Sequence, residues 1–192
     1  MKKLTALMLI AASFAASASL AFEDRKETFS TTISDSLGKG DIYGEIVTTV
    51  KHTKEDYLVN KRMKIVRRDA SGKEIWKVQD FIEDCPVDTT LQILKPVSLT
   101  DLNDNGLKEV WMVYKLACRG DITPADMKII MYEGKTKHAV RGSMKPPRDA
   151  EGEILPNDGA HNADENMKKA HSDVREHAEY IWRSYEEENF TD

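Results

Sequence analysis

The residues best suited to chemistry gather in one short stretch, residues 99–114, with the sequence LTDLNDNGLKEVWMVY. Oxygen-bearing side chains occupy alternate positions, a glycine follows them, and a carboxylate closes the run. Ligands spaced in this way, with a glycine where the chain must bend, are how a short loop wraps a hard cation such as calcium. A backbone carbonyl at the seventh position completes the expected set. The sequence therefore predicts a calcium site whose ligands are Asp101, Asn103, Asn105, Leu107 and Glu109.

The same residue types also fit a plain turn. Asn and Asp side chains bond readily to backbone N–H groups two residues further along, and Gly106 supplies the backbone freedom that a tight bend needs. The flanking residues are strand-like rather than helical, which separates this loop from an EF-hand. Both interpretations, a calcium loop and a turn that satisfies its own backbone, stay open from the sequence.

The loop resembles the calcium loops of FG-GAP/VCBS-type β-repeats, which join two antiparallel strands. It departs from them at Asn105, where those loops usually carry Asp, and at Glu109, where they carry Asp. With Asp101 and Glu109 as its two formal negative charges, we expect weak affinity, about 10⁻⁴–10⁻³ M. The segment CRGDITPADMKIIMYEGKTKHAVRG and the C-terminal residues also resemble small exported bacterial proteins without an assigned activity. Some of those proteins are associated with envelope polysaccharide. The resemblance therefore implies envelope polysaccharide as a partner.

Motifs of the common catalytic classes are missing. The chain has no Gly-x-Ser-x-Gly elbow, P-loop, dinucleotide-binding glycine pattern or His-Glu-x-x-His pair. We therefore name no catalytic residue and interpret the protein as a non-enzymatic binding or structural protein. One alternative is an envelope glycan hydrolase in which Asp101 and Glu109 do acid/base work. Another is an inhibitor or partner of a second envelope protein, bound through the C-terminal helix or a basic strand: Arg62, Lys64 and Arg68, with Lys61 and Arg67 between.

Residues 1–21 have the pattern of a secretory signal peptide. Lys2 and Lys3 precede an apolar stretch that ends in small residues, and cleavage fits after Ala18 or Ala21, with Ala21 favoured. No later apolar run approaches the length of a membrane-spanning helix. We predict a periplasmic or secreted protein with no membrane span after cleavage.

The remaining residues, 22–192, are enough for a single domain with its own core. Without Lys2 and Lys3, the 28 basic residues fall to 26 against 33 acidic ones, a net charge of −7. This acidic balance argues against nucleic-acid binding. In an oxidising compartment the two cysteines, Cys85 and Cys118, are predicted to form a disulfide.

Alternating apolar residues predict about seven strands joined by short turns. Residues 110–117 are apolar on both faces and so belong at the centre of a sheet. Residues 22–41 are predicted to be an arm or a first edge strand. The seven predicted strands cover residues 42–52, 57–68, 74–82, 91–99, 110–117, 127–132 and 138–141.

After the strands, residues 142–162 are rich in proline and glycine and are predicted to form a surface loop. Residues 163–188 then show apolar side chains at steps of three and four, which predicts an amphipathic helix packed on the sheet. Asn162 and Glu165 have the spacing of a capping box at its start. The predicted fold class is α+β: a mostly antiparallel sheet followed by a C-terminal helix.

Overall fold

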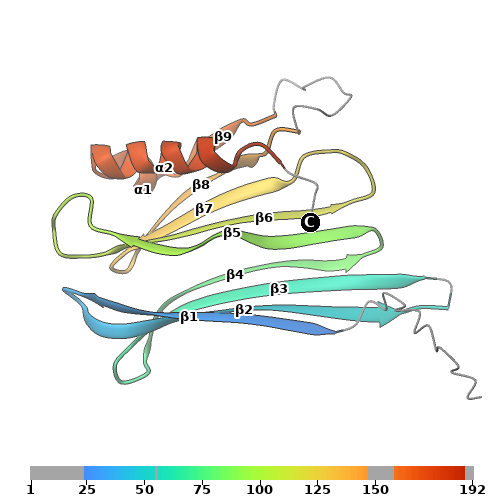
Figure 1. Ribbon diagram of the computed structural model, residues 1–192, viewed down its shortest axis with the longest axis horizontal. Coiled ribbons are helices and arrows are strands. Elements are labelled where there is room, and N and C mark those ends of the chain that lie inside the picture. The colour runs from blue at the N-terminus through green and yellow to red at the C-terminus, as the bar shows by residue number, and fades with distance from the viewer. Residues whose placement is uncertain (1–23, 55, 147–157, 189–192) are drawn as a thin grey trace, which may run out of the picture.

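The computed structural model describes residues 24–54, 56–146 and 158–188. Within this part of the chain, two antiparallel sheets pack face to face, and helices cover the outer face of the second sheet (Figure 1). The predicted signal peptide and most of the predicted loop at 142–162 lie outside the described residues. None of the helices in the described ranges is long and apolar enough to cross a membrane.

Both sheets are simple meanders in which each strand pairs with the next one along the chain. The first sheet, sheet A, consists of β1 (Arg25–Asp35), β2 (Gly38–His52), β3 (Tyr57–Asp69) and β4 (Glu74–Cys85). The second, sheet B, consists of β5 (Asp88–Thr100), β6 (Glu109–Arg119), β7 (Asp126–Glu133), β8 (Thr136–Ser143) and β9 (His161–Ala163).

The prediction of seven strands in one sheet is wrong, because the described residues form nine strands in two sheets. The first extra strand, β1, comes from residues that were predicted as an arm or an edge strand. The second, β9, pairs with β8 where Gly142 lies against Ala160; a Cβ on Gly142 would lie 2.0 Å from the Ala160 carbonyl oxygen. Alternation shows which face of each strand is buried, but not which strands share a sheet. Here the link of Pro86 and Val87 carries the chain from one sheet to the other.

The first hydrophobic core fills the space between the sheets. Ile42, Met63 and Ile65 of sheet A are almost fully buried against Val110 and other side chains of sheet B. Polar contacts cross the same interface: the Asp80 carboxylate accepts hydrogen bonds from the Tyr114 hydroxyl at 3.0 Å and the Lys128 Nζ at 2.6 Å. Apolar burial therefore holds the sheets together, and the Asp80 bonds satisfy the polar atoms enclosed there.

A second core lies between sheet B and the helices α1 (Glu165–Lys169) and α2 (Ser172–Tyr185). The predicted apolar stripe packs on the sheet, as expected, with Met167, Val174, Ala178, Ile181 and Trp182 buried. Strand β6 contributes to both cores, Met112 to one and Trp111 to the other. Its apolar character on both faces, predicted from the sequence, therefore reflects a strand that is covered on both sides. The strand is not at the centre of the sheet, as predicted, but lies between the edge strand β5 and the central strand β7.

The single helix predicted over residues 163–188 is divided in the structure. The backbone is extended at Ala170 and His171, and the His171 Nδ1 accepts a hydrogen bond from the Asp173 N–H at 3.4 Å. The predicted capping box is also displaced: Asp164, not Asn162, caps α1 by accepting the Met167 N–H at 2.8 Å. Asn162 instead belongs to β9.

The predicted Cys85–Cys118 disulfide is present, with its Cα atoms 5.8 Å apart. Cys85 ends β4 in sheet A and Cys118 lies near the end of β6 in sheet B, so the bond joins the two sheets covalently. It closes a loop with a sequence separation of 33 residues. The chain-entropy model gives such a crosslink about 3–4 kcal/mol of stabilisation.

Candidate functional site

The loop between β5 and β6 folds as a chain of side-chain-to-backbone hydrogen bonds. The Asn103 Oδ1 accepts the Asn105 N–H at 3.3 Å, and the Asn105 Oδ1 accepts the Leu107 N–H at 2.8 Å. The Asp101 Oδ1 accepts the Gly106 N–H at 3.3 Å and closes the bend. Gly106 has a φ of +79°, in the left-handed region that favours glycine. The predicted ligands Asp101, Asn103 and Asn105 are therefore brought together around one bend.

Glu133, which the sequence analysis did not single out, completes this cluster. It ends β7, and its Oε1 accepts the Asn103 Nδ2 at 2.7 Å and the Asn105 Nδ2 at 2.6 Å. The residue lies beside the loop because β6 and β7 are antiparallel, which places Glu133 directly opposite Glu109. Strand pairing would have indicated this neighbour, but spacing along the chain does not, since the loop and Glu133 are far apart in sequence.

Glu109 holds the loop from its buried side. Its side chain is fully buried, and its Oε2 accepts the Thr100 hydroxyl at 2.7 Å and the Leu102 N–H at 3.0 Å. The Thr100 oxygen in turn accepts the Trp111 indole N–H at 2.7 Å. The Glu109 carboxylate thus ties the start of the loop to the second core, whereas the two Asn amides contact Glu133.

The described part of the chain contains no cluster of three or more His, Cys, Asp or Glu side chains placed to hold a metal ion, and this includes the carboxylates of the loop. Around the bend the oxygen atoms come from amides, carbonyls and carboxylates, which are the ligands that calcium prefers. At present the Nδ2 atoms of Asn103 and Asn105 face the Glu133 carboxylate. If both amides turned over, their oxygens would face Glu133 instead, and the hydrogen bonds from those oxygens to the loop backbone would be lost. Asp101, Asn103, Asn105 and Glu133 are therefore the residues that could hold a calcium ion here. The carboxylate of Glu109, a predicted ligand, is instead engaged by Thr100 and Leu102.

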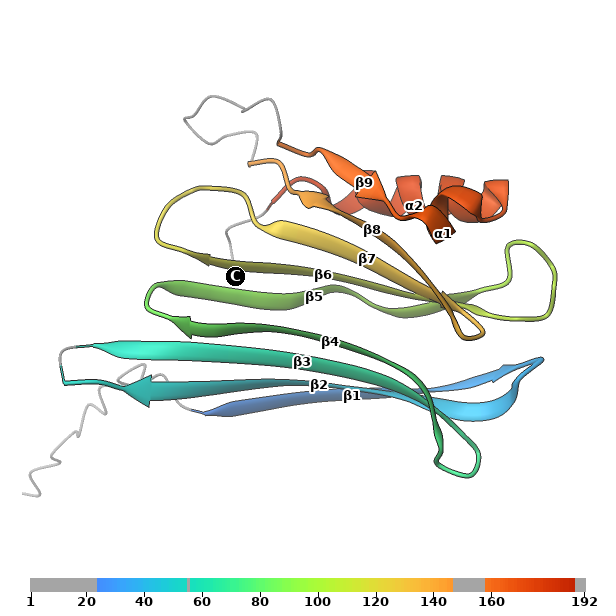
Figure 2. The same cartoon turned by 180° about the vertical axis from the view of Figure 1, so that it is seen from behind.

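One turn from each sheet contacts this loop (Figure 2). Ser36, in the β1–β2 turn, donates from its N–H at 2.8 Å and its hydroxyl at 2.7 Å to the Gly106 carbonyl. Glu133 ends β7 at the β7–β8 turn and holds the loop from the other side, through the two Asn amides. The loop is therefore the junction at which sheet A and sheet B are fastened together at one end of the sandwich.

A buried ion pair supports the same junction. Both side chains of Asp35 and Arg67 are at most 1% exposed, and the two are joined by two hydrogen bonds of 2.8 and 3.0 Å. Burial alone would raise the pKa of Asp35, but the hydrogen bonds from Arg67 and from the N–H groups of Leu37 and Lys108 outweigh it and hold the pKa below its usual value. Arg67 therefore cannot take part in the predicted basic surface of this strand, because its side chain faces the interior.

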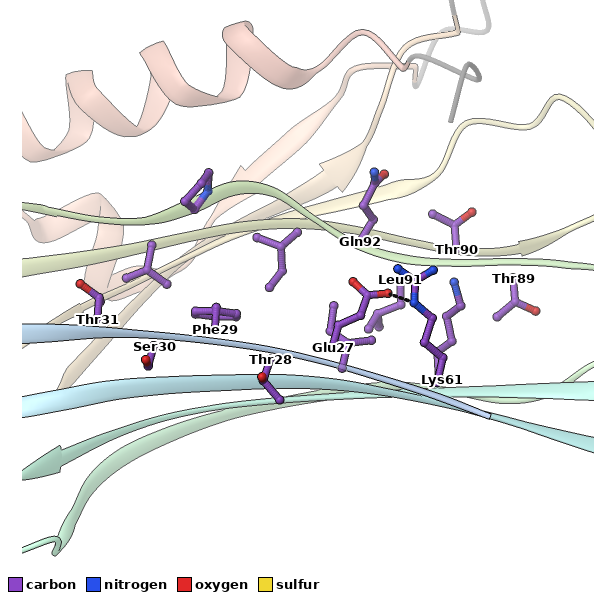
Figure 3. A pocket seen from close by; sticks show the side chains of 15 residues that line it. Glu27, Thr28, Phe29, Ser30, Thr31, Lys61, Thr89, Thr90, Leu91 and Gln92 are labelled. Carbon is purple, nitrogen blue, oxygen red and sulfur yellow. Dashed lines mark ion pairs between the residues drawn. The ribbon is translucent and has the colours of Figure 1, made fainter. Parts of the chain in front are cut away.

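A separate hollow lies along the open side of the sandwich, between β1 and β5 (Figure 3). Its volume is about 930 Å³. Apolar side chains from both sheets form its floor, and hydroxyl and charged groups from the two strands line its rim. The apolar members are Phe29, Ile46, Leu91, Ile93, Pro96 and Val97. We call this hollow the edge groove.

Phe29 shapes the floor of the edge groove. It lies directly opposite Gly44 on β2, and a Cβ on Gly44 would lie 2.1 Å from the Phe29 ring. The ring therefore packs flat over the glycine, and Figure 3 shows it edge-on between β1 and the side chains of β5. Alternation along single strands does not predict the groove, because strands of two different sheets line it.

Comparison with known proteins adds no relative: the chain matches no protein-family model, no curated protein and no solved structure.

Proposed function

We propose that this protein is an exported, non-enzymatic binding or structural protein whose loop at residues 101–109 binds calcium weakly. The observation that carries the proposal is the position of the loop, which contacts one turn from each sheet. A cation bound there would hold the β1–β2, β5–β6 and β7–β8 turns in one arrangement. Its role is architectural: it offsets the charges of Asp101, Glu109 and Glu133 and stiffens the end of the sandwich.

Export is supported by the inter-sheet disulfide, since such bonds persist in oxidising compartments. It also follows from the signal-peptide pattern of residues 1–21. The partner that fits this setting is an envelope polysaccharide or another envelope protein.

The geometry favours an architectural role for Asp101 and Glu109 over glycan hydrolysis. A glycosidase needs two carboxyl groups facing a cleft. Glu109 is fully buried and bonded to Thr100 and Leu102, and the Asp101 carboxylate is engaged by the Gly106 N–H and lies 3.7 Å from the Lys108 Nζ. Neither carboxylate lines the edge groove.

The calcium proposal is tested by thermal unfolding of the oxidised protein in chelator and then in calcium, with magnesium as the control ion. For a Kd of about 1 mM, calcium at about 10 mM stabilises by about 1.4 kcal/mol. That corresponds to a rise in Tm of about 3–6 °C for a domain of this size. Asp101→Ala should abolish the rise and Glu133→Gln should reduce it.

The matched control is Asp104→Asn. Asp104 carries a charge in the same loop, but it is exposed and has a φ of +52°, which Asn tolerates. The control variant should keep the full calcium response. An unchanged Tm in the wild type, or an equal rise in Asp101→Ala, would contradict a calcium site in this loop.

A further inference from the structure

The edge groove is bordered by strand edges rather than by one face of a strand. Consecutive residues, Glu27–Thr31 of β1 and Thr89–Ile93 of β5, line it. Side chains alternate between the two faces of a strand, so a hollow over one face would be lined by every second residue. Lining by consecutive residues shows that the hollow follows the backbone edges of both strands, where N–H and C=O groups are presented.

Between Thr28 and Ser34, the edge of β1 lacks the usual protection. Strand β1 pairs with β2 in an unbroken register from Arg25 to Asp35, and within the described residues it pairs with no other strand. It contains no proline, and no charged residue lies between Thr28 and Ser34. Natural edge strands are usually protected by charges, prolines or bulges. The edge of β5 has such protection, since it contains Pro96 and two register shifts between Ile93 and Ser98.

The floor of the groove suits the side chains of an added strand. A strand paired to β1 would direct every second side chain toward Phe29 and Ile46 of sheet A and toward Ile93 and Val97 of β5. The intervening side chains would point to solvent. Main-chain bonds to β1 would supply affinity, and the apolar floor would select an occupant with alternating apolar residues.

Charges of both signs gather at one end of the groove. Arg25, Glu27 and Lys61 line both the edge groove and a hollow that adjoins it. Asp24 and Asp88 line that hollow as well, so three carboxylates and two cations share this end. Opposite charges nearly balance here, and charge therefore sets no direction for an added strand.

We propose that β1 accepts an extended segment of another polypeptide as an added strand, with apolar side chains at alternate positions. This inference rests on the proposed role as a binding protein and names its partner class. It does not depend on calcium.

The test uses the oxidised protein without its predicted signal peptide. The probe is a fluorescent peptide of about nine residues, close to the length of β1, with alternating valine and threonine and an unblocked carboxyl terminus. Binding is followed by fluorescence anisotropy, and hydrogen exchange is followed at the amides of β1. We expect saturable binding and slower exchange along Arg25–Asp35.

A pair of N-methylated peptides tests pairing through the main chain. One peptide is methylated at alternate amides and the other at the remaining amides, so the two have the same apolarity. In an added strand only alternate residues bond to the edge. One methylated peptide should therefore lose binding while the other keeps it. Equal loss in both, or equal retention in both, would overturn strand addition.

Other occupants are distinguishable outcomes. A concentration-dependent dimer that the peptide dissociates would overturn the choice of partner in favour of a second copy of this chain. Saturation by dodecanoate with exclusion of the peptide would identify an acyl chain instead. No binding at millimolar peptide overturns the proposal. Failure of the calcium test alone leaves all these readouts unaffected.

Discussion

The buried pair of Arg67 and Asp35 gives the sharpest test of how the junction is held. Replacing Arg67 with Met removes the cation and leaves the Asp35 carboxylate, whose side chain is 0% exposed, without its main partner. Removing one member of a buried pair costs about 3–5 kcal/mol, because the remaining charge is left uncompensated. For a domain of this size the expected fall in Tm is about 6–20 °C.

Equilibrium unfolding in guanidinium, followed by tryptophan fluorescence, measures this cost. Trp76 lies directly opposite Arg67 on β4 and is 5% exposed, so it reports on the affected region. The matched control is Arg68→Met. The Arg68 side chain is 38% exposed, and its Nη1 lies 3.7 Å from the Asp41 Oδ2. This substitution should lower the free energy of unfolding by less than about 0.5 kcal/mol. The double variant Asp35→Asn/Arg67→Met should recover more than half of the loss, because no buried charge remains unpaired.

The pH dependence of the same variants follows from the pKa of Asp35. A carboxyl whose pKa is lowered in the folded protein contributes stability above its unfolded value of about 3.9, and this stability is lost as the pH falls through the folded pKa. In Arg67→Met, burial raises the pKa of Asp35 and the group protonates sooner. The penalty should therefore be largest near neutral pH and shrink on acidification. Equal costs for Arg67→Met and Arg68→Met, or a cost independent of pH, would refute the reasoning.

Three further predictions concern other parts of the fold. Replacing both cysteines, Cys85→Ala/Cys118→Ala, should lower the free energy of unfolding by about 3–4 kcal/mol, and a loss below about 1 kcal/mol would show that the crosslink adds little. Glu188→Gln should cost about 2–3 kcal/mol at pH 7, because the fully buried Glu188 carboxylate accepts hydrogen bonds from Arg119 at 2.6 and 2.9 Å and from the Ala125 N–H at 2.8 Å. Because these contacts hold the pKa of Glu188 below its usual value despite burial, its contribution is present above about pH 4.3 and shrinks as the pH falls toward the lowered pKa; a difference from wild type that does not shrink on acidification would contradict the assignment. Gly44→Ala should displace the Phe29 ring and cost about 1–3 kcal/mol in the same unfolding assay, with recovery in Phe29→Leu/Gly44→Ala; no loss would show that the ring moves aside without cost.

Several elements were predictable because they depend on local pattern. Alternation identified β2–β8, and the two-faced apolar run of residues 110–117 identified β6 as a strand buried on both faces. The cysteine count identified the disulfide. The apolar stripe identified the helical region, although not the break at Ala170 and His171, which is set by extended backbone rather than by a proline or glycine.

The remaining features depend on tertiary neighbours. Alternation along β3 puts Arg67 on the same face as the apolar residues. The residue that compensates its buried charge, Asp35, lies 32 positions away in the sequence. Glu133 joins the loop only because β7 returns beside β6. The edge groove lies between strands of two sheets, and the sequence analysis predicted a single sheet. Sequence spacing therefore identified the loop, whereas its junction with sheet A and the groove required the fold.

The order of the two meanders has a consequence for biosynthesis. Every strand of sheet A precedes every strand of sheet B, and neighbouring strands follow one another along the chain. A chain that emerges from its amino terminus can therefore pair β1 to β4 through local hairpins before β5 is available. Until then the side chains of Ile42, Met63 and Ile65 lack their cover from sheet B. A nascent chain at this stage therefore exposes the apolar face of sheet A. A chaperone that covers this face would prevent aggregation until sheet B has formed.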